Sequence, residues 1–293
     1  MRRLFDSFGK LPDRRISRGA AVLAVFLLLA LASDLFAGVL AAPTVIFLSD
    51  KNRTGRLNLE NPSNKPKEVE IYFAFGIPTS DSLGNIQLTL QDSNVTDPRS
   101  AKDWVRAFPR KLLLPANGSQ VVRLLAVPPK DLPDGEYWAR VVIRSQEGET
   151  SLPSATESDQ ITTQLNMVMQ TALSLKYRTG ELAAAVALDK AEARFETDGV
   201  QVLADLTNKG NVCYLGLMTC RLLDADNRLI SSTQNNLAVY RSMRQRVNLP
   251  LAEGEFKKPY QVEISVSCDG RTDIDRNDII FGNELQYMAQ VEE

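Results

Sequence analysis

Hydrophobic and polar residues alternate along most of the chain with the period of two that is typical of β-strands. The clearest run is Glu68–Phe75, in which Val69, Ile71, Phe73 and Phe75 share one face. Turn-forming Pro, Gly, Asn and Asp separate the runs, and no sustained helical period follows residue 41. The pattern therefore predicts an all-β protein. The further predicted strands are Ile86–Leu90, Ser119–Ala126, Tyr137–Arg144, Ile161–Tyr177, Ala184–Leu188, Gly199–Thr207, Val212–Leu223, Met243–Leu249 and Tyr260–Cys268.

Length and turn signals divide the chain into two domains. About 250 residues follow residue 41, enough for two domains of typical size. Gln146–Gln160 is rich in Ser, Thr and Glu and predicts a loop before the strand Ile161–Tyr177. We therefore predict two Ig-like antiparallel β-sandwich domains, residues 42–178 and residues 179–293.

Residues 1–41 have the pattern of an export signal. The apolar run Gly19–Ala32 is shorter than the roughly 20 residues that a membrane span needs. Val39–Ala41 offers a small-residue cleavage pattern, so we predict cleavage after Ala41 and export of the protein. The alternative is an uncleaved inner-membrane anchor. The basic residues that precede the apolar run are Arg2, Arg3, Lys10, Arg14, Arg15 and Arg18.

Composition argues against several functional classes. The chain has no histidine, which removes Ser-His-Asp and Cys-His sites and the commonest zinc ligand. The formal net charge of −2 argues against nucleic acid as the main partner. No convergent set of acid, base and nucleophile is evident. We therefore expect no enzyme activity, no cofactor, no metal and no small-molecule substrate.

Three cysteines allow at most one disulfide bond within the chain. Cys213 and Cys220 are seven residues apart in one predicted strand, so their side chains would lie on opposite faces. Cys220 and Cys268 form the pair we favour, because an oxidising compartment permits a disulfide there. The alternative is three buried thiols that never pair.

Two stretches of the first domain, Phe108–Arg123 and Leu132–Ile143, resemble the periplasmic pilus chaperones, the PapD-like family. A third stretch, Gln164–Arg178, resembles the strand with which such chaperones complete a pilin fold. The resemblance implies a protein-binding role in the periplasm of a Gram-negative bacterium. The implied partners are pilus or fimbrial subunits and an outer-membrane usher.

The resemblance assigns Leu165, Met167 and Met169 to the donor strand, whose side chains would fill a groove in the partner. Main-chain hydrogen bonds would supply affinity in such strand addition, and adaptable methionines would allow several partners. The alternative is an ordinary half-buried strand of the protein's own sandwich, which produces the same alternation.

The family also places two cations that grip the subunit's terminal carboxylate. Here Val45 stands at the arginine position and Ser174 at the lysine position. Neither can form a charged contact with a carboxylate, so the usual anchor is not predicted.

A second charged set matches the family pattern, in which an ion-pair network joins the two domains. Its matching residues here are Glu136 and Arg178, with Glu253 and Glu255 as candidates for a third carboxylate. The alternative is two unrelated surface charges, which would contribute little to stability.

One acidic segment, Asp273–Glu284, resembles a calcium-binding loop. Asp278 stands where the loop needs glycine, and no helical pattern precedes it, so we predict an acidic turn instead. Taken together, the sequence predicts a chaperone that stabilises pilus-type subunits by strand complementation. The alternative is an envelope structural or adhesive protein with the same architecture.

Overall fold

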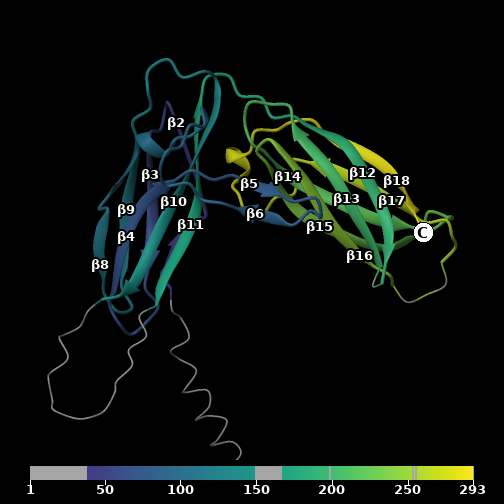
Figure 1. Ribbon diagram of the computed structural model, residues 1–293, viewed down its shortest axis with the longest axis horizontal. Helices are drawn as coiled ribbons and strands as arrows, with labels where there is room; N and C mark the ends of the chain where they lie inside the picture. Colours follow the sequence, from purple (N-terminus) through teal and green to yellow (C-terminus); the bar gives the residue numbers. More distant parts are fainter. Residues whose placement is uncertain (1–37, 149–166, 198, 253, 255, 293) are drawn as a thin grey trace, which may run out of the picture.

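The computed structural model describes residues 38–148, 167–197, 199–252, 254 and 256–292. Within these residues the chain is all-β, as predicted, and its helical segments are two short 3-10 turns, η2 (Lys102–Trp104) and η3 (Arg276–Asp278). The strands form two lobes that meet at an angle (Figure 1). Each lobe is a β-sandwich domain with its own apolar core.

The first domain packs a four-stranded sheet on a five-stranded sheet. Alternation places Leu57 and Leu124 of one sheet against Ile71, Val141 and Leu175 of the other, and all five are fully buried. The first sheet has the order β1 (Leu40–Ala42), β3 (Thr54–Glu60), β9 (Ser119–Ala126) and β7 (Val105–Phe108). The second has the order β2 (Val45–Ser49), β11 (Val168–Thr179), β10 (Gly135–Glu147), β4 (Lys67–Ala74) and β8 (Lys111–Leu114).

The second domain folds one seven-stranded sheet back on itself. Its two halves join where β12 and β18 pair in parallel at Ala193 and Val291, and they meet again where Asn235 Nδ2 donates to the main-chain oxygen of Arg246. The strand order is β15 (Leu229–Val239), β14 (Tyr214–Leu223), β17 (Gln261–Ser267), β18 (Leu285–Glu292), β12 (Val186–Glu196), β13 (Gly199–Asn208) and β16 (Ser242–Pro250).

The two cores divide close to Thr179, where β11 ends. The first core includes Tyr177 and the second begins with Ala184, but Phe75 and Trp138 of the first domain also belong to the second core. The domains therefore share an apolar contact and are not merely linked by one connecting strand.

The N-terminal boundary of the folded domain lies before residue 42. Val39 is buried in the first core, and Leu40–Ala42 forms β1, which pairs with β3. Cleavage after Ala41 would remove two of the three residues of this strand. The predicted apolar run lies outside the described residues, and no helix among those described has the length and hydrophobicity to span a membrane.

The favoured disulfide is not formed. Cys213, Cys220 and Cys268 are all buried free thiols. Cys220 lies opposite Ile264 in the ladder, so Cys268 is four residues further along its strand, about 13 Å away. A disulfide needs Cα atoms within about 7 Å, so the alternative of three unpaired thiols is correct for this fold.

A small hairpin links the two domains. Its strands are β5 (Pro78–Ser80) and β6 (Ile86–Leu88), which follow β4 and lie between the lobes in Figure 1. β5 lies beside β16 of the second domain. The predicted strand Ile86–Leu90 is therefore a short arm outside the first sandwich.

Candidate functional site

The edge of β11 is the first candidate site. β10 pairs with β11 along Val168–Thr179, but β2 covers its other edge only from Ser174 to Arg178. Among the described residues no strand pairs with the remaining edge, Val168–Leu173. We call this segment the open edge. Its unpaired main-chain groups can accept another strand.

Apolar side chains mark the beginning of the open edge. Met167, Val168 and Met169 are 52%, 44% and 37% exposed. Met167 and Met169 share the face of Leu173, which is buried, but they extend past the point where the core covers that face. They are therefore partly exposed and do not lie in the protein's own core. Leu165 lies outside the described residues.

The two expected anchor positions lie side by side. Val45 of β2 pairs with Ser174 of β11, and Ser174 pairs with Arg140 of β10. These three paired residues therefore include no cation at either expected position, but Arg140 places one on the neighbouring strand. Sequence comparison with the family gave no reason to select Arg140.

The side chain of Arg140 is buried and reaches the second domain. Its Nε donates to the main-chain oxygen of Gly76 at 2.8 Å, and its Nη2 donates to the Tyr240 hydroxyl at 3.4 Å. The Tyr240 hydroxyl also lies 3.1 Å from Ser174 Oγ. One tyrosine of the second domain therefore closes over two polar side chains of the first.

Glu136 and Arg178 do form an ion pair, and it is buried. Arg178 Nε lies 2.8 Å from Glu136 Oε2, and Lys176 Nζ lies 2.8 Å from Glu136 Oε1. Glu136 is 0% exposed and Arg178 is 8% exposed. Trp138 Nε1 and the main-chain N–H of Cys213 also donate to Oε1. We call Glu136, Lys176 and Arg178 the buried triad.

Glu136 and Lys176 remain ionised in the buried triad, although burial disfavours a charged group. Burial opposes ionisation of Glu136, but the charges and hydrogen bonds of Lys176 and Arg178 outweigh it, so the pKa of Glu136 is lowered. Burial also opposes the charge of Lys176, yet its neighbours Cys213 and Glu136 raise its pKa. Because burial raises the pKa of Cys213 to about 11, its thiol is neutral near pH 7 and Glu136 is the effective partner.

The second domain meets the triad through main-chain groups and through the ring of Tyr240, whose centroid lies 4.1 Å from Lys176 Nζ. Arg178 Nη1 donates to the main-chain oxygen of Asp278 at 2.6 Å, and the Cys213 N–H donates to Glu136. The predicted third carboxylates, Glu253 and Glu255, lie outside the described residues. The sequence prediction did not include Lys176 in this ion-pair network. The signal was present in the sequence, because Ser174, Lys176 and Arg178 recur at a spacing of two between apolar residues.

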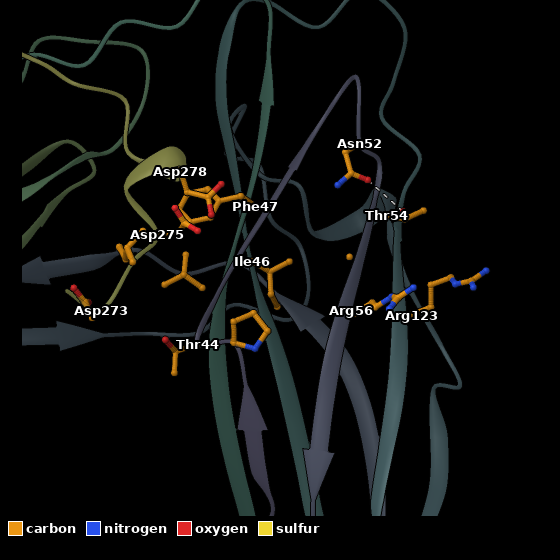
Figure 2. A pocket seen from close by; sticks show the side chains of 14 residues that line it. Thr44, Ile46, Phe47, Asn52, Thr54, Arg56, Arg123, Asp273, Asp275 and Asp278 are labelled. Atoms are coloured by element: carbon orange, nitrogen blue, oxygen red, sulfur yellow. Dashed lines mark hydrogen bonds between the residues drawn. The ribbon is translucent and has the colours of Figure 1, made fainter. Parts of the chain in front are cut away.

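A pocket of about 800 Å³ lies beside β2, where the second domain approaches the first (Figure 2). Its acidic side comes from the turn around η3, and burial raises the pKa of Asp278 there. Asp273 is held by Arg271, and Asp275 accepts from the Asn277 N–H. These carboxylates are engaged in the turn, and no metal-binding group of His, Cys, Asp or Glu occurs among the described residues. The charged side chains that line the pocket are Arg56, Arg123, Asp273, Asp275 and Asp278.

Comparison with solved structures found chaperones. The Pseudomonas aeruginosa CupB2 chaperone is 14% identical, with a TM-score of 0.39 over 85% of this chain and 98% of that chain. The class 5 fimbriae chaperone CfaA is 16% identical, with a TM-score of 0.44 over 86% and 99%. A chain of the CsuC–CsuE chaperone–subunit complex from Csu pili of Acinetobacter baumannii is 11% identical, with a TM-score of 0.42 over 88% and 100%.

These structures are of the class that the sequence motifs resemble. No family model matches the chain, and no curated protein matches it. Because the identities and TM-scores are low, function has to be inferred from the residues of the chain itself.

Proposed function

We propose that this protein is a periplasmic chaperone that binds pilus or fimbrial subunits by lending them the open edge of β11. The observation that carries the proposal is the combination of an unpaired backbone edge with exposed Met167, Val168 and Met169. An exposed apolar edge strand invites aggregation, so proteins usually cover it unless a partner uses it.

The buried triad supports this role from the other half of the same strand. It fixes β11 against the second domain just beyond the point where the open edge ends. A rigid strand loses less conformational freedom when it binds, which favours affinity. The partner would be an incomplete β-sandwich that accepts β11 as its missing strand, with Met167 and Met169 in its groove.

Hydrogen exchange of the main chain tests strand addition directly. Wild-type protein would be co-expressed with small β-sandwich subunits encoded near its gene, and the complex would be purified. We expect the amides of Val168, Gln170 and Ala172 to become protected in the complex, because alternate N–H groups of β11 face the open edge, as that of Ser174 faces β2. The amides of Ser174–Arg178 serve as an internal control, because they are already paired on both sides in the free protein. A complex that leaves the open edge unprotected would contradict the proposal.

The alternative is a structural or adhesive envelope protein, and the loss of both expected cations at Val45 and Ser174 favours it. Such a protein would remain in the assembled surface structure, whereas a chaperone would be released. Detection of the chain in purified surface fibres, in amounts comparable to the subunits, would support the alternative.

A further inference from the structure

The hairpin formed by β5 and β6 is a stiff arm that leaves the first domain. Main-chain hydrogen bonds of 2.7 Å in both directions between Phe75 and Gln91 close its base. The carboxylate of Asp81 fixes its tip, because it accepts from the N–H groups of Leu83 and Asn85 at 2.9 and 2.8 Å. An arm held at both ends can transmit force between the parts that it touches.

The tip of the hairpin grips the outer edge of β16. The N–H of Arg244 donates to Ser80 Oγ at 2.6 Å, and Nη1 of Arg244 donates to the main-chain oxygen of Ser82 at 2.9 Å. The rest of the Arg244 guanidinium is held by Asp205 at 2.6 and 2.7 Å. The arginine side chain therefore ties the hairpin to two neighbouring strands of the second domain.

Gly84 allows the hairpin to lie flat on β16. Its φ of +75° is a conformation that side-chain-bearing residues rarely adopt. A Cβ atom there would lie 2.8 Å from the Cβ of Arg246 and 3.1 Å from its main-chain nitrogen. Any larger residue at position 84 would lift the tip away from the strand.

The position of this contact gives it leverage over the angle between the domains. The buried triad and Tyr240 lie close to the connection between the domains, whereas Arg246 lies four residues beyond the start of β16, about 13 Å along the strand. A contact far from a hinge restrains rotation more effectively than one close to it. Arg241 of the second domain and Asp97 of the first form a further ion pair, at 2.7 Å.

We propose that the β5–β6 hairpin is an interdomain brace that sets the angle between the two domains, with Ser80 and Gly84 as its positioning residues. The brace acts independently of the buried triad, because it uses different residues of both domains. If the proposed function holds, the brace also determines how the open edge of β11 is presented to a partner.

Distance measurements between the domains test the brace without reference to function. Spin labels would be attached at Val121→Cys in the first domain and Leu229→Cys in the second, two exposed sites, while the native thiols are buried. Pulsed electron resonance on the full chain should give one narrow distance distribution. In Gly84→Val we expect that distribution to broaden and its mean to shift by several ångströms. An unchanged distribution in Gly84→Val would overturn the proposal.

Two further variants guard against a general loss of structure. Ser80→Ala removes only the hydroxyl that accepts from Arg244, and it should broaden the distribution by a smaller amount. Ser82→Ala is the matched control, because its side chain makes no hydrogen bond in the described structure and its main-chain oxygen is retained. Broadening in Ser82→Ala equal to that in Ser80→Ala would also count against the brace.

The effect on partner binding separates the brace from the proposed function. We expect Gly84→Val to lower the affinity for a subunit by about tenfold, since the two domains are no longer held at a single angle. A broadened distance distribution with unchanged affinity would overturn the role of the brace in presenting β11 and leave strand donation intact. Failure of strand donation would instead appear as unprotected amides at the open edge.

Discussion

The two halves of β11 have opposite properties. From Ser174 to Arg178 the strand is paired on both edges and carries charged side chains that are buried under the second domain. From Val168 to Leu173 it is paired on one edge among the residues that the structure describes, and its first residues expose apolar side chains to solvent. A folded protein normally places charges outside and apolar groups inside, so each half departs from the usual pattern.

The difference shows that one strand can be stabilised at one end in order to remain open at the other. Buried ion pairs are costly to desolvate and contribute little net stability compared with an apolar core. The buried ion pairs act here mainly by orienting β11, because charged hydrogen bonds are directional. The open half can then offer an edge and two methionines without depending on a partner for its own conformation.

The largest expected effect comes from removing the centre of the buried triad. Glu136→Ala leaves the charges of Lys176 and Arg178 buried without a carboxylate, and we expect a loss of about 4 kcal/mol in the free energy of unfolding. Arg178→Ala should cost less, about 3 kcal/mol, because Lys176 still neutralises Glu136. Urea unfolding measures both. Glu60→Ala, at an exposed position of β3, is the control and should change the value by less than about 0.5 kcal/mol.

A loss below about 1 kcal/mol for Glu136→Ala would mean that the triad behaves as an exposed pair. The two halves of β11 would then not differ in the way that the structure shows.

The second effect concerns the open half. Met167→Glu places a charge where a partner groove would be apolar, and we expect affinity for a subunit to fall at least about 100-fold, or about 2.7 kcal/mol. Because Met167 is 52% exposed, the free energy of unfolding should change by less than about 0.5 kcal/mol. Gln170→Glu is the matched control, since it adds the same charge to the opposite face of the same strand. A Met167→Glu variant that unfolds would place the side chain in the core instead.

The third expected effect is a dependence on pH of the stability that the buried triad contributes. The pKa of Glu136 is lowered from 4.5 in the folded state, so its contribution is complete above that pH and is lost as pH falls through the folded-state pKa. The stability difference between wild type and Glu136→Gln should therefore be largest near pH 7 and shrink below pH 4.5. Other carboxyls with a lowered pKa, such as Asp50 and Asp205, are common to both proteins and cancel. A difference that is constant down to pH 3 would contradict the ionised triad.

Sequence patterns predicted the parts of this molecule that depend on alternation alone. Glu68–Phe75 and Ser119–Ala126 became β4 and β9 almost unchanged, because buried strands in a sandwich must alternate. β15 was missed because Ser231–Asn236 is continuously polar, and it is a strand only through pairing with β14. Its position depends on contacts distant in sequence, which a local pattern does not contain.

The residues of the candidate site likewise include some that the sequence predicted and some that only the structure revealed. Glu136 and Arg178 could be matched to a family pattern, but Lys176, Arg140 and Tyr240 join the site through three different strands and turns. The Cys220–Cys268 prediction was wrong because it used strand membership without register. Register and the approach of the second domain are set by the whole fold, so no single segment could reveal them.

The smallest expected effect tests whether the boundary between the two halves binds a partner's terminal carboxylate. Amidating the C-terminus of a bound subunit should lower its affinity by less than about tenfold, or about 1.4 kcal/mol, because Val45 and Ser174 supply no cation. Arg140 lies on the same row, but it already donates to Gly76 and Tyr240. Affinity would be measured for the free-acid and amidated subunits, with wild type and with Arg140→Gln as the control. A much larger loss that disappears in Arg140→Gln would show that Arg140 binds the carboxylate. The buried half would then contact the partner directly and would do more than orient the open edge.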